Sequence, residues 1–362
     1  MKMSKNIIIA TGGTGGHVLP ACSLAELLLE KGFKVKIVID ARGSKYIGNY
    51  KEMNYEIISS GTIFKKNPIN ILFSSIKIIF AFLKSILIMI KFKPKIVFGM
   101  GGYSSFPVCI VAKIFRIPVI IYENNLHAGK ANRFLLPFAN KMFVSYLSLE
   151  GINNKYRHKV FEVGNLIRKN ILNYSGYKEK KISNTMTILV LGGSQGAKTF
   201  ALKLPLVFQK CVEYGISLNV YQQCLPAQNQ ELKNYYDSLK IKNEIFNFTN
   251  DLLSIFPKID LAITRSGSSM LAELLNCSIP IVSIPLPSSA ENHQLKNAKY
   301  FEKLGYSFLI EEDKIPEKLF PLIKSIHEDK ELLNQMRKKQ MMYSDKEVFK
   351  KIQSQIKEMI ND

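Results

Sequence analysis

Apolar runs that end in glycine-rich turns recur along this chain. Residues 7–10 lead into Thr-Gly-Gly-Thr-Gly-Gly-His at 11–17, and residues 188–191 lead into Gly-Gly-Ser-Gln-Gly-Ala at 192–197. Helical spacing of apolar residues follows the first turn, at 21–28. Each unit is typical of a buried strand that enters a helix, so that backbone N–H groups and a helix N-terminus face an anion. We therefore predict an α/β protein of two Rossmann-like domains with parallel sheets facing a central cleft, where ligands bind beyond the carboxyl ends of the strands.

The first half contains a third turn and another polar strand end. Residues 96–105, Ile-Val-Phe-Gly-Met-Gly-Gly-Tyr-Ser-Ser, predict a second anion-binding turn on this side. The apolar residues 118–122 lead into Glu-Asn-Asn at 123–125, whose carboxylate and amide groups would emerge at the same sheet edge. Asn125 is either a ligand-binding residue or an ordinary loop former, and its place at a strand end favours the first interpretation.

The glycine turns do not match standard nucleotide-binding motifs. Residues 13–18, Gly-Thr-Gly-Gly-His-Val, lack the last glycine of G-x-G-x-x-G. No Gly-Lys-Ser/Thr follows either of the paired turns. A single glycine turn could merely permit a tight bend. The patterns disfavour a dehydrogenase and a kinase.

The second half predicts a phosphate- or sugar-binding region after its later strands. Residues 260–264 predict a short buried strand, and Arg-Ser-Gly-Ser-Ser at 265–269 would let a helix beginning near Met270 approach a phosphate or sugar. Glu273 is expected on the first turn of that helix, where a carboxylate either complements the helix dipole or accepts bonds from sugar hydroxyls.

A second polar cluster follows the apolar residues 279–287. His293 and Gln294 lie where another helix is expected to begin, and they would either cap that helix or bind sugar hydroxyls. The His and Cys residues of the chain show no metal-ligand spacing, so no zinc site is expected.

The long apolar segment at 69–92 predicts an amphipathic helix. Lys77 and Lys84 disfavour a spanning helix, because a charge at its centre costs about 2.5–3.5 kcal/mol. We expect one part of the apolar surface to pack on a sheet and another to enter an anionic membrane surface. The alternative is a wholly buried crossover helix. The lysines expected to meet lipid headgroups are Lys65, Lys66, Lys91, Lys93 and Lys95.

Composition and net charge limit the kinds of binding partner and cellular compartment that this chain can have. The 362 residues, 47% hydrophobic and 22% charged, suit a folded chain of two domains. The net charge of +21 indicates a polyanionic partner, either an anionic membrane face or phosphorylated substrates, and no nucleic-acid partner is expected because no nucleic-acid-binding motif is present. Five scattered cysteines and an N-terminus without a secretory pattern are typical of a reduced, cytoplasmic protein.

A domain boundary is predicted near Gly164. A polar stretch at 173–186 follows, so the domains are expected to span 1–164 and 165–362. Residues 330–362 have helical spacing and would be solvated or packed between domains, with the last helix on the first domain.

In order along nearly the whole chain, these motifs resemble the MurG family, UDP-N-acetylglucosamine transferases that convert lipid I to lipid II in peptidoglycan synthesis. The resemblance rests on residues 12–17, 99–103, 192–197, 265–267 with Glu273, and 292–298. It implies a GT-B fold and an inverting, metal-independent transfer of N-acetylglucosamine to the muramyl 4-hydroxyl of lipid I, without a cofactor. Its implied partners are UDP-N-acetylglucosamine, lipid I, an anionic membrane surface through residues 69–92, and cell-wall and division complexes. The implied location is peripheral, on the cytoplasmic face of the bacterial inner membrane.

The resemblance also implies roles for single residues. The catalytic candidates are His17, Glu273 and Asn125. His17 would act as the general base, because imidazole titrates near neutral pH, or it would instead orient a phosphate. Arg168 and helix N-termini would stabilise the leaving diphosphate. The implied donor-binding residues are Thr14, Gly15, Gly16, Asn125, Arg168, Gly193, Ser194, Gln195, Phe248, Thr249, Ser268, Met270, Glu273, His293 and Gln294. The implied acceptor-binding residues are Gly13, Thr14, His17, Gly101, Gly102, Tyr103 and Ser104.

The chain departs from the family pattern at two positions, and three rival functions are considered. Phe106 stands where many relatives have glycine, and His293 where some have glutamine. A diacylglycerol glycosyltransferase or a UDP-N-acetylglucosamine epimerase would share the donor motif, but the two turns of the first half favour the lipid I acceptor. A non-enzymatic membrane-bound scaffold would need neither the paired turns nor a donor-site carboxylate.

Overall fold

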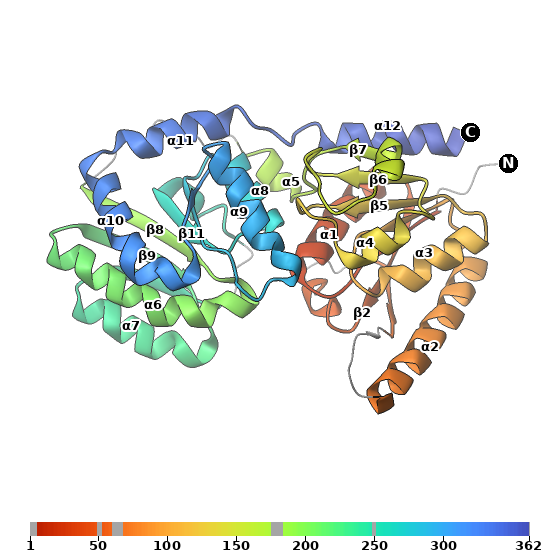
Figure 1. The fold of residues 1–362 in the computed structure, drawn as a ribbon, viewed down its shortest axis with the longest axis horizontal. Helices are drawn as coiled ribbons and strands as arrows, with labels where there is room; N and C mark the ends of the chain where they lie inside the picture. Colours follow the sequence, from red (N-terminus) through yellow and green to blue (C-terminus); the bar gives the residue numbers. More distant parts are fainter. Residues whose placement is uncertain (1–5, 49–52, 60–67, 175–183, 248–250, 362) are drawn as a thin grey trace. The chain divides into compact units, whose positions relative to one another are not determined.

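The chain folds into two α/β units, and the computed structural model describes residues 6–48, 53–59, 68–174, 184–247 and 251–361 (Figure 1). The first unit comprises Met1–Lys169 together with Asp345–Asp362, and the second comprises Asn170–Ser344. The chain therefore leaves the first unit a few residues after Gly164 and returns to it near the C-terminus.

A parallel sheet of seven strands forms the centre of the first unit, in the order β3-β2-β1-β4-β5-β6-β7. The central strands are apolar on both faces, as is typical of parallel strands covered by helices, and Ile7, Ile8 and Ile9 are fully buried. The turns that follow neighbouring strands meet at one edge of this sheet. The strands are β1 (Asn6–Ala10), β2 (Lys34–Asp40), β3 (Tyr55–Ile58), β4 (Ile96–Gly99), β5 (Val119–Glu123), β6 (Lys141–Val144) and β7 (Val160–Glu162).

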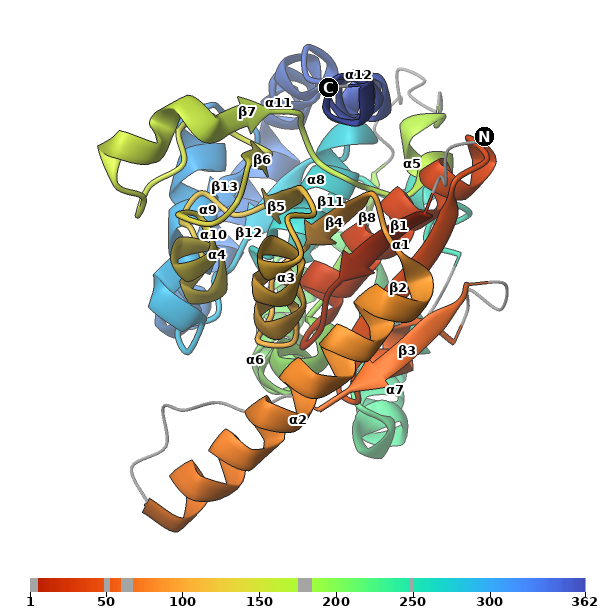
Figure 2. The same cartoon turned by 90° about the vertical axis from the view of Figure 1, so that its right-hand side faces the viewer.

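Helices cover the sheet of the first unit. α2 lies beside α3 (Figure 2), and the rings of Phe82 and Phe106 meet edge to face with centroids 6.4 Å apart. Lys141 ties the C-terminal helix α12 to the sheet through Gln355 at 2.8 Å and Glu358 at 3.1 Å. The helices are α1 (Gly15–Glu30), η1 (Ser44–Tyr46), α2 (Pro68–Phe92), α3 (Ser105–Ile114), α4 (Lys130–Leu135), η2 (Asn154–Lys159), α5 (Lys169–Leu172, which crosses into the second unit) and α12 (Val348–Asn361).

The helix α2 has a buried face and an outward face. Its buried face includes small residues, with Ser74 5%, Ala81 2% and Ser85 0% exposed, so the helix can pack closely. Its outward face carries large apolar side chains, which are Ile76, Ile79, Phe80, Leu83, Leu87 and Ile90. Among the described residues, no helix is both long and apolar enough to cross a membrane.

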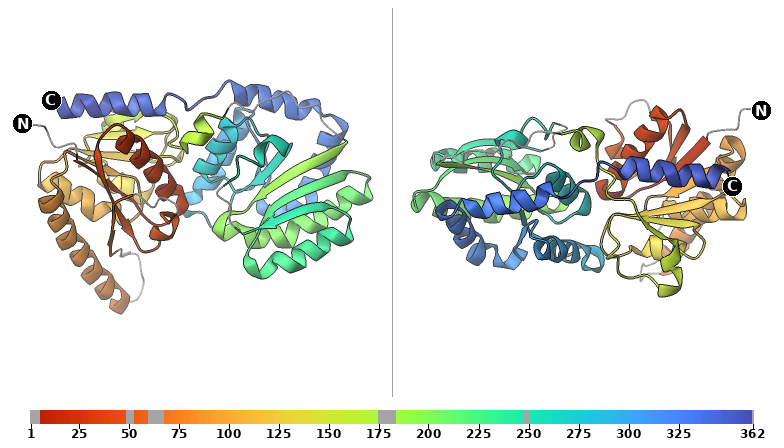
Figure 3. Two further views of the ribbon diagram at one scale, coloured as in Figure 1. Left: turned by 180° about the vertical axis from the view of Figure 1, so that it is seen from behind. Right: turned by 90° about the horizontal axis from the view of Figure 1, so that it is seen from above.

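The second unit has a parallel sheet of six strands in the order β10-β9-β8-β11-β12-β13. α6 and α7 lie along one face of this sheet (Figure 3), and α6 also contacts α10. The strands are β8 (Thr185–Leu191), β9 (Ser217–Gln223), β10 (Lys242–Phe246), β11 (Leu261–Thr264), β12 (Ile281–Ser283) and β13 (Phe308–Leu309). The helices are α6 (Gly193–Glu213), η3 (Pro226–Gln228), α7 (Asn229–Ser238), η4 (Phe256–Lys258), α8 (Ser268–Asn276), η5 (Ala290–Asn292), α9 (His293–Lys303), η6 (Glu312–Lys314), α10 (Ile315–Glu328) and α11 (Glu331–Met341).

The helical pattern of residues 330–362 is divided between the two units. In the second unit, Arg337 of α11 donates to the carbonyl of Asp260 at 3.1 Å, and Gln340 donates to the carbonyls of Ile279 and Tyr306. In the first unit, the buried carboxylate of Asp345 accepts the backbone N–H of Asn165 at 2.8 Å. Buried hydrogen bonds therefore anchor α11 in the second unit, and the segments around Asn165 and Asp345 in the first.

Candidate functional site

Two glycine turns of the first unit touch each other at the ends of β1 and β4. Gly102 has a φ of +81°, and a Cβ there would lie 2.6 Å from the carbonyl oxygen of Gly12. The hydroxyl of Ser104 donates to the carbonyl of Thr11 at 2.6 Å. Ser104 is fully buried, and its hydroxyl holds the two turns together.

His17 and Gly101 are brought together by this contact between turns. A Cβ on Gly101 would lie 2.7 Å from Nδ1 of His17, and Gly101 has a φ of +88°. His17 is half-buried on the first turn of α1, whereas Thr14 and Gly16 are exposed. Thr14 is the N-cap of α1, and Gly15, Gly16 and His17 form its first turn, so the helix begins inside the predicted turn at 11–17.

The end of β5 adds amide groups to the same region. The amide of Asn124 donates to the carbonyl of Gly16 at 3.0 Å, which joins the end of β5 to the turn after β1. The buried carboxylate of Glu123 accepts the backbone N–H and the side-chain amide of Asn125 at 3.1 and 3.0 Å. It also accepts the backbone N–H of Gly129 at 2.9 Å. Asn125 is therefore held in place, and its neighbour Asn124, whose amide the sequence also placed at this edge, contacts the turn.

A carboxylate that sequence reasoning missed lies under the first turn. Asp40 ends β2 with its side chain 1% exposed, and its Oδ1 accepts the N–H groups of Gly13 and Gly43, both at 2.9 Å. Its Oδ2 accepts Nε and Nη2 of Arg42 at 3.2 and 2.9 Å. The signal available in the sequence was an aspartate at the end of a predicted strand next to β1.

Tyr103 and Arg168 occupy more exposed places in the first unit. Tyr103 is 36% exposed directly after the contacting glycines. Arg168 is half-buried, three residues beyond Asn165, whose N–H is held by Asp345.

In the second unit, the turn after β8 starts α6. Gly193 has a φ of +62°, which favours glycine, and its N–H donates to Oε1 of Gln223 at 3.0 Å. Ser194 and Gln195 follow on the first turn of α6, and their side chains are outside what the structure describes. Phe248 and Thr249 also lie outside the described residues.

The loop between β11 and α8 is tied to the start of α9. Oε1 of Gln294 accepts the N–H groups of Ser266 at 3.2 Å and Leu286 at 2.9 Å. The amide of Asn297 donates to the carbonyl of Ser266 at 3.1 Å. Gln294 therefore joins two loops, and Nδ1 of His293 lies 2.7 Å from the carbonyl of Ala290.

Arg265 is the buried cation of this loop. Its guanidinium pairs with Glu312, donates to the carbonyls of Ile284 and Pro285 at 3.3 Å, and lies 4.4 Å from the ring centre of Phe200. Burial lowers the pKa of Arg265, and the bond to Glu312 opposes that shift. The sequence placed Arg265 in the turn. It did not indicate that the guanidinium contacts three other segments of the chain, at Phe200, at Ile284 and Pro285, and at Glu312.

The expected place of Glu273 on the first turn of its helix is wrong. Gly267 is the extended N-cap, so α8 begins at Ser268, before Met270. Glu273 is then the sixth residue of α8 and lies on its second turn, because a turn takes about 3.6 residues. Glu273 and Ser268 are both buried. Because Glu273 lies beyond the first turn, it does not complement the helix dipole there.

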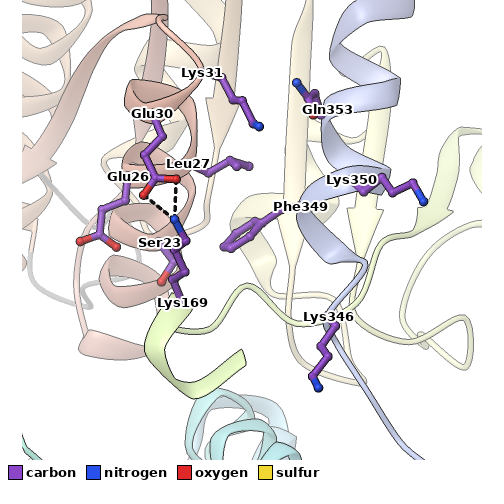
Figure 4. A pocket seen from close by; sticks show the side chains of 10 residues that line it. All are labelled: Ser23, Glu26, Leu27, Glu30, Lys31, Lys169, Lys346, Phe349, Lys350 and Gln353. Atoms are coloured by element: carbon purple, nitrogen blue, oxygen red, sulfur yellow. Dashed lines mark hydrogen bonds and ion pairs between the residues drawn. The ribbon is translucent and has the colours of Figure 1, made fainter. Parts of the chain in front are cut away.

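A separate pocket of about 290 Å³ lies between α1 and α12 of the first unit (Figure 4). There Lys169 reaches both carboxylate oxygens of Glu30 at 2.8 Å. Burial, and then the nearby Glu30, raises the pKa of Glu26 in its wall. Its lining contains none of the predicted site residues. In the part of the chain that the structure describes, no group of three or more His, Cys, Asp or Glu side chains could hold a metal ion.

Comparisons with known proteins cover nearly the whole chain. Residues 7–144 match the glycosyltransferase family 28 N-terminal domain and residues 187–359 match the family 28 C-terminal domain. A UDP-N-acetylglucosamine–N-acetylmuramyl-(pentapeptide) pyrophosphoryl-undecaprenol N-acetylglucosamine transferase from Pelagibacter ubique is 37% identical over 343 residues, 94% of each chain. The protein of the same name from Rickettsia canadensis is 34% identical over 316 residues, 86% of this chain and 87% of its own.

The fold is also that of a solved structure. The crystal structure of Acinetobacter baumannii MurG superposes with a TM-score of 0.78 at 23% sequence identity, over 98% of this chain and 99% of that one. The prediction of two Rossmann-like units with the GT-B fold is confirmed.

Proposed function

This chain belongs to the MurG family of UDP-N-acetylglucosamine–N-acetylmuramyl-(pentapeptide) pyrophosphoryl-undecaprenol N-acetylglucosamine transferases, and we propose that it forms lipid II and UDP from lipid I and UDP-N-acetylglucosamine. The transfer is to the 4-hydroxyl of the muramyl sugar, inverting and independent of metal. The observation that carries this proposal is the 37% identity to a transferase of that name over 94% of both chains.

The second unit is the proposed donor site. The buried carboxylate of Glu273 would accept hydrogen bonds from the sugar, and the loop joined by Gln294 would surround it. Since the Oε1 of Gln294 already accepts two N–H groups, only its NH₂ would face the donor. The remaining proposed donor residues are Gly193, Ser194, Gln195, Phe248, Thr249, Ser268, Met270 and His293, together with Thr14, Gly15, Gly16, Asn125 and Arg168 of the first unit.

The first unit is the proposed acceptor site. The turns after β1 and β4, in contact through Gly102, would bind the acceptor diphosphate with backbone N–H groups and the N-terminus of α1. His17, beside Gly101, would accept the proton of the attacking hydroxyl. Asn125, fixed by Glu123, would hydrogen-bond a reacting sugar. An H17A variant that keeps most of its turnover number would remove the base assignment.

The outward face of α2 is the proposed membrane surface. Phe80 is 62% and Leu87 55% exposed, and burying such side chains contributes about 1.5–3 kcal/mol each. Lys91, Lys93 and Lys95 are exposed at the end of this helix, where they could meet anionic headgroups. Lys65 and Lys66 lie outside the described residues. Such a surface would hold the enzyme peripherally on the cytoplasmic face of the inner membrane, near cell-wall and division complexes.

Vesicle flotation tests this surface. The double variant Phe80→Ser/Leu87→Ser should lose most binding to vesicles containing phosphatidylglycerol, because two anchoring side chains are removed. Leu202→Ser/Leu206→Ser is the matched control, since these leucines of α6 are 60% and 58% exposed on the other unit. Equal binding by both variants would mean that α2 is not the membrane surface.

The activity is tested by transfer of labelled N-acetylglucosamine from UDP-N-acetylglucosamine to a short-chain lipid I analogue in EDTA. Glu273→Gln should lower the rate roughly 10- to 100-fold, the effect of losing hydrogen bonds to a charged group. Glu302→Gln on the exposed face of α9 controls for charge. Transfer that needs metal, or no transfer while UDP-N-acetylglucosamine binds, would contradict the reaction proposed.

A further inference from the structure

We propose that Arg42 binds the diphosphate of the lipid-linked acceptor at the turn after β1, with Asp40 as the positioning residue that holds its guanidinium there. The inference rests on the proposed function, because that function supplies the diphosphate. It adds a side-chain ligand to a turn otherwise expected to bind through backbone N–H groups.

Both carboxylate oxygens of Asp40 are hydrogen-bonded. One oxygen accepts two backbone N–H groups, from Gly13 and Gly43, and the other accepts two N–H groups of Arg42. The side chain is 1% exposed. A buried carboxylate with these partners holds the groups that it contacts in place.

This arrangement is at odds with an anion site made of backbone alone. The N–H of Gly13, one of the donors the turn offers, points at Asp40. The carboxylate beneath the turn would also repel a diphosphate bound above it. The turn therefore needs a cation that both neutralises Asp40 and replaces the donor that Asp40 takes.

Arg42 has the geometry for both tasks. Its side chain is 59% exposed although it is paired with Asp40, so its outer edge faces solvent. A Cβ on Gly13 would lie 4.0 Å from Nη2 of Arg42, which places the guanidinium beside the turn. Two of the five guanidinium N–H groups bond Asp40. Within the part of the chain that the structure describes, the other three remain available to bind phosphate oxygens. A planar fork held on one edge is suited to a phosphate on the other.

Steady-state kinetics with a short-chain lipid I analogue test the assignment. Arg42→Ala should raise KM for the acceptor at least tenfold and leave KM for UDP-N-acetylglucosamine within twofold. Arg42→Lys should recover only part of the loss, because an ammonium lacks the fork. Lys34→Ala is the control, since this lysine is exposed at the far end of the same strand, β2. Its acceptor KM should equal that of the wild type.

The double variant Arg42→Ala/Asp40→Asn separates binding from structural neutralisation. If Arg42 contacts the diphosphate, the acceptor KM stays raised when the buried charge of Asp40 is also removed. If Arg42 serves only to neutralise Asp40, the double variant regains the wild-type KM, and the proposal is overturned. The double variant leaves no unpaired buried charge, so it keeps the test valid if Arg42→Ala alone unfolds.

Binding of inorganic pyrophosphate, measured by calorimetry, distinguishes failure of this inference from failure of the proposed function. A wild type that transfers no sugar would end the proposed function, and with it the acceptor named here. A wild type that transfers sugar, with acceptor KM and pyrophosphate affinity both unchanged in the double variant, would overturn the role of Arg42 alone. A raised KM for UDP-N-acetylglucosamine instead would assign the guanidinium to the donor diphosphate and also overturn it.

Discussion

Replacing Gly102 by alanine tests the contact between the two turns of the first unit. Gly102 has a φ of +81°, and an added Cβ would lie 2.6 Å from the carbonyl oxygen of Gly12. Gly32 has a nearly equal φ of +78° after α1, yet an added Cβ there meets nothing within 4 Å. The two alanine variants therefore share the backbone cost and differ in the steric one.

The structure sets the expected magnitudes. A left-handed φ costs a non-glycine residue about 1–2 kcal/mol, which both variants should lose in free energy of unfolding. Gly102→Ala must also push backbone away from backbone, and forced overpacking costs about 1–3 kcal/mol more. At roughly 2–4 °C per kcal/mol for a domain of this size, Gly102→Ala should melt roughly 2–12 °C below Gly32→Ala.

Thermal unfolding followed by circular dichroism measures the difference, because the chain contains no tryptophan for fluorescence. Both glycines belong to the first unit, so the same transition reports both variants. The acceptor KM is the second measurement, and only Gly102→Ala should raise it, because that substitution separates the turns. Equal melting temperatures and equal acceptor KM values for the two variants would refute the contact and the acceptor site built on it.

Three further predictions concern packing and ionisation in the first unit. Burial, and then Glu30, raises the folded pKa of Glu26 above its ordinary 4.5. The stability contributed by the protonated carboxyl is therefore lost as pH rises through the folded value. Glu26→Gln should then raise the melting temperature at pH 7, where the wild-type carboxylate is charged. The gain should fade as pH falls toward 4.5, and a pH-independent gain would contradict this cause. Ala81→Leu, on the buried face of α2, should cost about 1–3 kcal/mol in chemical denaturation, whereas Lys77→Leu on an exposed position should not. Burial raises the pKa of Cys109 to about 12, so alkylation at pH 8 should be far slower in the native protein than in urea, and equal rates would show that the thiol is accessible.

Much of the fold could be predicted because its signals are local. The apolar residues 7–10 and the glycines after them predict a buried strand and a turn, and β1 ends at Ala10 with a short turn before α1 begins at Gly15. The apolar spacing of residues 69–92 likewise predicts the helix α2. The glycines of the predicted turn at 96–105 also fit the structure, since glycine adopts the φ values of Gly101 and Gly102 without strain.

The candidate site was less predictable where a hydrogen-bond partner is distant in the chain. Asp40 lies 27 residues from Gly13, and only the pairing of β1 with β2 places its carboxylate under the turn. Gln294 joins Ser266 across 28 residues for the same kind of reason. The missed place of Glu273 shows a shorter-range limit, because whether Gly267 or a later residue ends the loop depends on the surrounding packing.

By itself, the sequence determined the periodic elements, the glycine turns, the family and the class of reaction, since each depends on residue types at fixed spacing. Tertiary structure alone decided which face of α2 is buried. The apolar periodicity of that helix is compatible with burial of more than one face, and the packing of α3 against it selects one. It also decided that Asp40 uses the N–H of Gly13 and presents Arg42 at the turn. The physical reason is common to both: burial and hydrogen-bond partners depend on the register of strands and helices that are distant in sequence, and no local pattern encodes that register.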